Sequence, residues 1–222
     1  PTATPRFGGY EIAGSYSAAR IVGGDLFDFL TLADGRPLFF IGDVSGKGFP
    51  AALLMARIGA QLRAVAVRAR NAAEVLRLLD TQMRPELESG MFMTAVAAVL
   101  DVARGGVDIA SAGHPMPLLR RADGVVDTLP VVAAPALGVG GGNFYESRID
   151  LARGDGLLFY TDGLDEARNA DDEAFGLGRV HALLAAARSA GQAIEALTSA
   201  VEAYYGDLEP FDDLALIALW RR

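Results

Sequence analysis

Carboxylates stand at the ends of apolar runs at four places along this chain of 222 residues. Each place has an ordinary structural explanation, because acids commonly flank strands and Asp–Gly pairs form turns. The residues are Asp25 with Asp28, Asp43, Asp162, and Asp212 with Asp213. In a chain with 2 histidines and no cysteine, four such places together favour an oxygen-only site for the hard cations Mg²⁺ or Mn²⁺. Like charges cannot crowd together without such compensation.

Two divalent cations held about 3.5–4 Å apart by carboxylates are a common device for phosphoester hydrolysis. They offset the phosphate charge and lower the pKa of a shared water, so that hydroxide is available near neutral pH. No protein nucleophile is then required, which agrees with the absence of cysteine. These residue types therefore favour hydrolysis by a metal-activated water.

Composition narrows the classes of protein to consider. The net charge of -8 argues against nucleic-acid binding, because no basic excess is available to neutralise phosphates. No apolar stretch reaches the ~18 residues of a membrane-spanning helix, so we expect no membrane insertion of this domain. The absence of cysteine fits a cytoplasmic location. We expect residues 1–9, with two prolines and two glycines, to be a lead-in, and residues 10–222 to form a single domain.

The stretch around Asp43 predicts a strand, a turn that carries the carboxylate, and a helix. The apolar run Leu38–Ile41 indicates a buried strand, the carboxylate follows where that strand should emerge, and Pro50 opens a helix that runs to Ala69. The pair Asp34–Gly35 is a strong hairpin signal, which joins this strand to an earlier one at residues 21–30. The hairpin could bring Asp25 or Asp28 towards Asp43.

The rest of the chain alternates between segments with the apolar spacing of helices and segments typical of strands. Apolar spacing predicts further helices over residues 72–87, 179–190 and 192–205. In the helix after Pro50 it directs one face inward, made of Leu53, Leu54, Ile58, Leu62, Val65 and Ala69. Strands are expected at 10–17, 91–102, 107–113, 118–121, 125–129, 144–151, 157–161 and 214–220. Glycine turns between strands of this length indicate antiparallel sheets.

Five short motifs occur in a fixed order, and together they resemble a known family. They are Val22–Asp28, Gly42–Gly48, Ser111–Pro115, Tyr160–Leu164 and Asp212–Ala215. This set resembles the PPM family of metal-dependent serine/threonine protein phosphatases, in its bacterial SpoIIE-like, RsbU-like branch. The resemblance runs from about Tyr10 to Leu219, nearly the full chain.

The resemblance implies a fold, an activity and its partners. The fold is α+β, a four-layer α-β-β-α sandwich of two antiparallel sheets flanked by helices. The implied activity is hydrolysis of phosphoserine or phosphothreonine on a bacterial regulatory protein of the anti-anti-sigma-factor type, with two or three Mn²⁺ or Mg²⁺ ions. We expect an upstream sensor or receiver domain in the full-length chain. Whether the protein forms a homodimer is left open at this point.

Matched motif to motif, the resemblance also implies roles for residues in the first hairpin. Asp43 would bridge two metals, and the carbonyl of Val44 would bind one of them. Asp25 would bind directly or through ordered water, with Asp28 as the weaker candidate of that pair. In this chain Ser45 stands two residues after Asp43, where eukaryotic relatives have a histidine proposed as general acid. Protonation of the leaving group must then come from water held by the metals, or be less assisted.

Further roles fall outside that hairpin. Asp162 and Asp212 would complete the second metal site, with Asp213 as the weaker candidate of its pair. Arg20 lies five residues before Asp25, the spacing of the phosphate-binding arginine of the relatives, and a guanidinium suits bidentate phosphate binding. A solvated arginine is the competing interpretation.

Three other polar residues receive structural interpretations. We expect His114, between a glycine and a proline, to be structural, His181 to lie on a helix surface, and Lys47 to be a solvated turn residue.

Two rival functions are weaker. Gly23–Gly24–Asp25 resembles the turn of diguanylate cyclases, but Leu26 stands where that turn needs an acid. A regulatory module that binds its partner without catalysis would be expected to lose site carboxylates, and this chain keeps an aspartate at every matched place.

Overall fold

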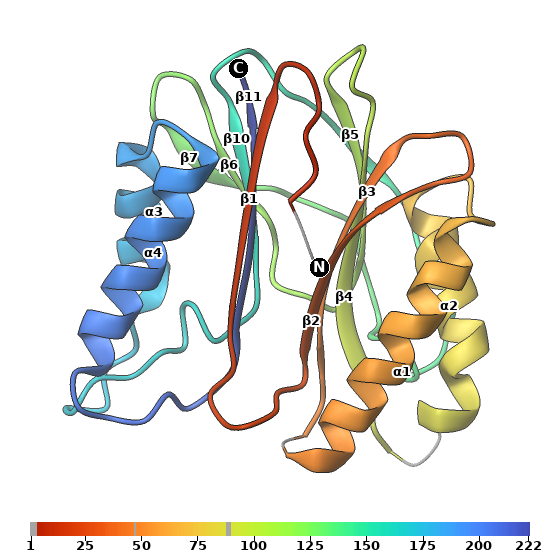
Figure 1. The fold of residues 1–222 in the computed structure, drawn as a ribbon, viewed down its shortest axis with the longest axis horizontal. Helices are drawn as coiled ribbons and strands as arrows, with labels where there is room; N and C mark the ends of the chain where they lie inside the picture. The colour runs from red at the N-terminus through yellow and green to blue at the C-terminus, as the bar shows by residue number, and fades with distance from the viewer. Residues whose placement is uncertain (1–3, 47, 88–89) are drawn as a thin grey trace. The chain divides into compact units, whose positions relative to one another are not determined.

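The computed structural model describes residues 4–46, 48–87 and 90–222, and the chain divides into two compact units (Figure 1). The first unit contains Val22–His114 and Pro130–Leu151. The second contains the described residues up to Ile21, together with Pro115–Leu129 and Ala152–Arg222. Each unit is one β-sheet with a pair of helices.

The sheet of the first unit is built around the predicted hairpin. Its strands are β2 (Asp25–Thr31), β3 (Pro37–Val44), β4 (Met93–Leu100), β5 (Gly106–Ala112), β8 (Ala133–Ala134) and β9 (Ser147–Asp150). They run in the order β2-β3-β4-β5-β8, and β9 also pairs with β5. The pairing is antiparallel except between β5 and the two-residue strand β8, which is parallel. The sheet is therefore antiparallel as expected, apart from this short parallel edge.

Helices α1 (Phe49–Ala66) and α2 (Ala72–Leu87) lie side by side against this sheet (Figure 1). Leu54, Ile58 and Leu62 of α1 are buried in the core, as the spacing predicts. Leu53 is 55% exposed, so its placement on the inward face is wrong. Successive helical residues point about 100° apart, and Leu54 occupies the inward direction.

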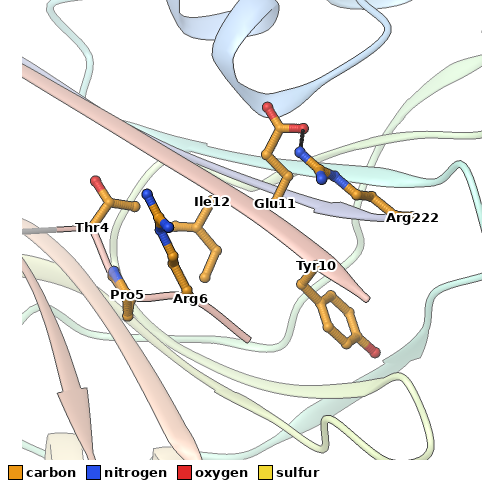
Figure 2. A pocket seen from close by; sticks show the side chains of 7 residues that line it. All are labelled: Thr4, Pro5, Arg6, Tyr10, Glu11, Ile12 and Arg222. Atoms are coloured by element: carbon orange, nitrogen blue, oxygen red, sulfur yellow. Dashed lines mark hydrogen bonds and ion pairs between the residues drawn. The ribbon is translucent and has the colours of Figure 1, made fainter. Parts of the chain in front are cut away.

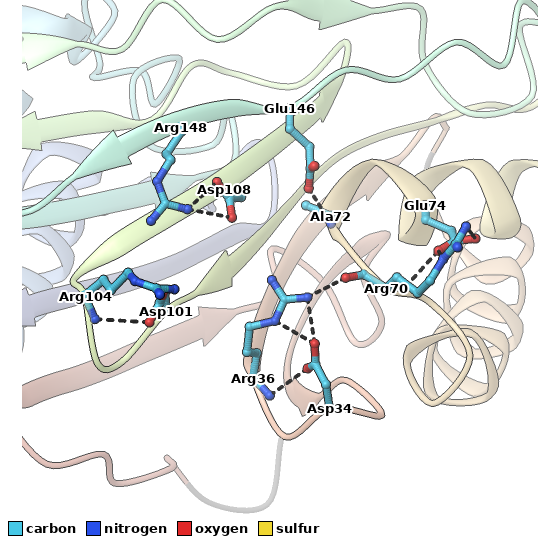
Figure 3. Close-up of polar contacts among 10 residues, drawn as sticks. All are labelled: Asp34, Arg36, Arg70, Ala72, Glu74, Asp101, Arg104, Asp108, Glu146 and Arg148. Atoms are coloured by element: carbon cyan, nitrogen blue, oxygen red, sulfur yellow. Dashed lines mark hydrogen bonds and ion pairs between the residues drawn. The ribbon is translucent and has the colours of Figure 1, made fainter.

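Polar contacts hold the hairpin and the helices of the first unit together (Figure 3). At the hairpin tip, Arg36 pairs with Asp34 at 2.8 Å and also donates to the carbonyl of Arg70, between α1 and α2. Glu146 accepts a hydrogen bond of 2.9 Å from the backbone N–H of Ala72, the first residue of α2. The first contact joins the hairpin tip to the loop between the helices, and the second joins α2 to the segment before β9.

The second unit has the order β1-β11-β10-β6-β7 in its sheet. The bounds are β1 (Tyr10–Ser17), β6 (Leu118–Arg120), β7 (Val126–Thr128), β10 (Gly156–Tyr160), β11 (Leu214–Arg221), α3 (Gly176–Ala186) and α4 (Ala190–Tyr205). Helix α4 packs on β1 and β11, and α3 packs on α4 (Figure 1). The α4 N-terminus is capped by Ser189, whose side chain accepts from the backbone N–H of Gln192 at 3.2 Å.

Within the residues that the structure describes, two sheets and four helices form an α+β fold, which confirms the predicted fold class. Strand β2 begins at Asp25, so the predicted start at Ile21 is four residues too early; Gly23 and Gly24 separate the apolar pair from the strand. In the described part of the chain, no helix combines the length and apolar character needed to cross a bilayer.

Two leucines of α1 test the packing of the first unit. We expect Leu62→Ala to lower the free energy of unfolding by about 2–5 kcal/mol, because Leu62 is fully buried and truncation leaves a cavity. Leu53→Ala should change it by less than about 0.5 kcal/mol, because Leu53 is exposed. Urea unfolding of both variants measures the difference, and equal losses would contradict the assignment of the helix face.

Candidate metal-binding site

In the first unit, strand pairing brings Asp25 and Asp43 together. They are directly opposite each other in the β2–β3 register, so both side chains lie on the same face of the sheet. Directly opposite residues have Cβ atoms about 4.5–5.5 Å apart. Asp25 is buried and Asp43 is half-buried. Backbone geometry therefore holds two carboxylates close to each other at the hairpin's open end.

Strand alternation separates Asp28 from this pair. Asp28 lies three residues after Asp25, so its side chain points to the opposite face of the sheet, towards α1. There its carboxylate accepts a hydrogen bond of 2.7 Å from Nη2 of Arg63 and one of 2.9 Å from the backbone N–H of Phe29. Asp28 is thus a buried structural acid that ties β2 to α1, and Asp25 is the partner of Asp43.

A glycine makes room for the oxygen atoms at this end of the hairpin. A Cβ added to Gly24 would lie 3.0 Å from the carbonyl oxygen of Val44 and 3.4 Å from Oδ1 of Asp43. The carbonyl of Gly24 accepts a hydrogen bond of 3.3 Å from the N–H of Val44. Oxygen atoms of Val44 and Asp43 therefore meet at a space that any larger residue would fill.

In the second unit, Asp162 and Asp212 line one small hollow of about 10 Å³. Such a volume is close to the minimum needed for one water. Glu166 and Tyr205 also line it. Burial raises the pKa of the Asp162 carboxyl, and the negative charges of Asp212 and Glu166 raise it further. The two aspartates are therefore close enough to repel each other.

The backbone around this hollow is fixed by contacts between the loop after β10 and the start of β11. The N–H of Thr161 donates to the carbonyl of Ala215 at 3.1 Å, and the N–H of Ala215 donates to Oγ1 of Thr161 at 2.9 Å. A Cβ added to Gly163 would overlap the carbonyl oxygen of Asp213. Glycine is therefore required for the two segments to approach.

Asp213 is occupied differently from Asp212. Its Oδ1 accepts a hydrogen bond of 2.8 Å from the backbone N–H of Ala19, and only 8% of the residue is exposed. Its own N–H donates to Oδ1 of Asp212 at 3.0 Å. The carboxylate of Asp213 thus holds the segment after β1, and Asp212 is the member of the pair that faces the hollow.

The other predicted residues are placed as follows. Arg20 is exposed after β1, and its guanidinium has no hydrogen bond or ion pair within the described residues. Ser45 joins β3 to the start of β4, because its Oγ accepts 2.8 Å from the N–H of Phe92. His114 is buried with Nδ1 2.9 Å from Oγ1 of Thr94. His181 is half-buried on α3 rather than fully on the surface. Lys47 lies outside the described residues.

The donor atoms of both pairs fit a hard cation. They are carboxylate and carbonyl oxygens, the ligands that Mg²⁺ and Mn²⁺ take in proteins. Across residues 4–46, 48–87 and 90–222, no three acidic or histidine side chains form a complete metal-binding group. Each unit supplies two aspartates, and the convergence of the two pairs on shared cations stays a prediction.

A larger hollow of about 600 Å³ lies elsewhere in the second unit (Figure 2). It is lined by Arg6, Tyr10 and other residues near the chain ends, and the ion pair of Glu11 and Arg222, at 2.8 Å, lies on its wall. No predicted site residue lines it. Size alone therefore does not locate the chemistry of this protein.

Sequence reasoning did not find Glu166 and Tyr205. Glu166 follows Asp162 by one turn, and its N–H donates to the Asp162 carbonyl at 2.9 Å, so the four-residue spacing was a usable signal. Tyr205 ends α4, and only the packing of α4 places it beside Asp212.

Comparison with known proteins finds one family model and several relatives that agree with each other. The sequence model of the family described as "Stage II sporulation protein E (SpoIIE)" matches residues 33–222. Phosphoserine phosphatase RsbP of Bacillus subtilis is 26% identical over 159 residues, which cover 69% of this chain and 39% of RsbP. The chain spans 39% to 50% of the length of the curated relatives it matches.

Solved structures agree with that family. The RsbU and RsbW domains of Rv1364c from Mycobacterium tuberculosis match with a TM-score of 0.82 and 32% identity, over 96% of this chain and 62% of that one. The SiaA-PP2C domain of Pseudomonas aeruginosa matches with a TM-score of 0.82 and 26% identity, over 95% of this chain and 85% of that one. The fold is that of PP2C-type phosphatase domains.

A substitution at Gly163 tests the close approach of the two segments in the second unit. Gly163→Ala should destabilise the protein by about 1–3 kcal/mol, because the new methyl group overlaps the carbonyl of Asp213. Gly178→Ala is the matched control, since nothing lies within 4 Å of its added Cβ and alanine favours helix α3 by up to about 1 kcal/mol. Thermal unfolding compares them, and an unaffected Gly163→Ala protein would refute the contact.

Proposed function

The chain belongs to the SpoIIE family of PP2C-type (PPM) serine/threonine phosphatases, and we propose that its residues 10–222 form one catalytic domain that dephosphorylates a bacterial regulatory protein. The phosphate is removed from phosphoserine or phosphothreonine. The partner is a small phosphorylated regulator of the anti-anti-sigma type. In the full-length protein, an upstream sensor or receiver domain controls this activity.

One observation carries the proposal: Asp25 and Asp43 are held opposite each other beside the space at Gly24. Two acids placed directly opposite each other by strand pairing concentrate negative charge on one face of the sheet, which suits a cationic ligand. The motif order and the family support the same interpretation.

The residues proposed to hold two or three Mn²⁺ or Mg²⁺ ions are Asp25, Asp43 and the Val44 carbonyl in the first unit, and Asp162 and Asp212 in the second. When bound, such ions supply charge compensation for the phosphate and lower the pKa of a water that attacks phosphorus. The aspartates position the ions and accept hydrogen bonds from water. Arg20 binds two phosphate oxygens through its guanidinium.

The comparisons support the substrate class. RsbP is named a phosphoserine phosphatase, and the structure from Mycobacterium tuberculosis joins an RsbU domain to an RsbW domain. A phosphoserine protein is therefore the first substrate to test. The match covers 39% of RsbP, so the comparison bears on the activity of this domain and not on the signal that controls it.

Asp43→Asn tests the proposed metal-dependent hydrolysis. With Mn²⁺ and a phosphoserine peptide, we expect the variant to lose at least about 100-fold in kcat/KM, more than removal of an outer-shell group costs. Mn²⁺ binding, measured by isothermal titration calorimetry, should weaken in parallel, while circular dichroism shows a folded protein. The matched control is Asp34→Asn, which removes an exposed carboxylate at the other end of the same hairpin.

Three outcomes decide between the functions. Loss of turnover and of Mn²⁺ binding in Asp43→Asn, but not in Asp34→Asn, supports the phosphatase function. Near-normal turnover in Asp43→Asn would refute the role of this residue. A wild-type protein that is folded and binds a phosphoprotein tightly, but releases no phosphate with Mn²⁺ or Mg²⁺, would show a regulatory module that acts without catalysis.

Arg20→Ala tests phosphate recognition. We expect KM to rise about tenfold with little change in kcat, because the arginine binds the phosphate equally in the ground state and the transition state. The control is Arg153→Ala, which removes another exposed arginine of the second unit. Steady-state kinetics on one phosphopeptide gives both constants, and a fall in kcat at constant KM would contradict the role of Arg20.

A further inference from the structure

Another hollow in the second unit is also lined by Asp212. It has a volume of about 260 Å³ and is formed by the end of β1, the last turns of α4 and the segment that leads into β11. Its lining is Ser15, Tyr16, Ser17, Thr198, Val201, Glu202, Tyr205, Pro210, Asp212 and Leu214. We refer to it as the α4 pocket. Its volume is about that of eight or nine liquid waters, which suits a single side chain.

The α4 pocket adjoins the proposed catalytic site. Asp212 and Tyr205 line both the pocket and the small hollow shared with Asp162. Successive residues of an extended peptide are about 3.3 Å apart. A phosphopeptide whose phosphate reaches Asp162 and Asp212 would therefore carry a neighbouring side chain into the α4 pocket.

The charge of this region is one-sided. From Ser189 to Trp220 the sequence contains six acidic residues and no lysine or arginine. Glu202 on the pocket wall is exposed, and it takes part in no ion pair or hydrogen bond with the residues that the structure describes. A cationic group is the complementary ligand for such a wall.

Tyr205 adds an independent observation. Only 8% of this residue is exposed, and its hydroxyl has no hydrogen-bond partner within the described chain. A buried polar group without a partner costs free energy unless a ligand or water supplies one. Alongside Ser15, Ser17 and Thr198, the tyrosine makes the pocket rich in hydroxyl groups, which accept hydrogen bonds from N–H donors.

We propose that the α4 pocket binds a lysine or arginine side chain of the phosphoprotein substrate, close in sequence to the phosphorylated serine. This rests on the proposed phosphatase function and deepens it, because it names the feature that distinguishes the substrate from other phosphoproteins. The cationic head pairs with Glu202 and hydrogen-bonds to the pocket hydroxyls, and its aliphatic stem packs on Val201 and Leu214.

The test uses phosphoserine peptides that differ at one position. Lysine, arginine, glutamine or glutamate is placed in turn at each residue flanking the phosphoserine, and kcat/KM is measured with Mn²⁺. At one or two flanking positions we expect lysine and arginine to exceed glutamine by about two- to fivefold, the range of a solvent-exposed ion pair. Glutamate there should fall below glutamine, and added salt should reduce the preference.

Two variants of the same helix localise the effect. Glu202→Gln should bring the ratio of kcat/KM for the lysine and glutamine peptides towards one. Glu195→Gln removes an exposed carboxylate two turns earlier, which lines a different hollow, and should keep the ratio. Tyr205→Phe should reduce the ratio in part. An equal ratio in the wild type and Glu202→Gln would overturn the proposal.

Failure of the pocket and failure of the function give different results. Hydrolysis of all peptides at equal rates would overturn the pocket and leave the phosphatase intact. If the wild type hydrolyses no peptide, the phosphatase proposal fails, and calorimetric affinities of the same peptides still decide the pocket. Tighter binding of the lysine peptide that Glu202→Gln abolishes would support it, and equal affinities would refute it.

Discussion

Repulsion between carboxylates held in place by the backbone is the constraint on which the rest of this structure depends. Strand pairing fixes Asp25 opposite Asp43, and contacts between the loop after β10 and the start of β11 fix Asp162 near Asp212. Elsewhere a buried acid is neutralised by an arginine, as Asp80 is by Arg84 at 3.0 Å. Asp213 is held by the backbone N–H of Ala19 at 2.8 Å, whereas the closely placed aspartate pairs concentrate negative charge that favours a cation.

The glycines next to these acids serve close approach rather than unusual backbone angles. Gly24 and Gly163 do not have positive φ, whereas Gly46 and Gly48, between β3 and α1, have φ of 96° and 79°. A Cβ at Gly24 would press on oxygen atoms of Val44 and Asp43, and one at Gly163 would overlap a carbonyl. Both glycines are therefore needed because a side chain at either position would displace nearby oxygen atoms.

Local signals in the sequence predicted much of the fold. The hairpin at Asp34–Gly35 sets the register that joins Asp25 to Asp43, and α2 has the predicted bounds. Errors arose where tertiary packing decides. The two residues of β8 carry no periodic pattern, and Leu53 and Leu54 compete for one direction of a helix. Asp28 could be separated from Asp25 only by the alternation of a strand whose start was uncertain.

The α4 pocket could not be read from the sequence, because β1 and the end of α4 are almost the whole chain apart. Its charge nevertheless has a consequence for recognition. Under the proposed function, two divalent cations would carry as much positive charge as the four aspartates carry negative charge, so bound ions would remove the repulsion of phosphate without offsetting the carboxylate of Glu202 on the pocket wall. A substrate would then meet a neutralised centre beside an acidic wall. A peptide with a phosphate and a nearby basic side chain complements both, and a peptide with acids around its phosphate complements only the first.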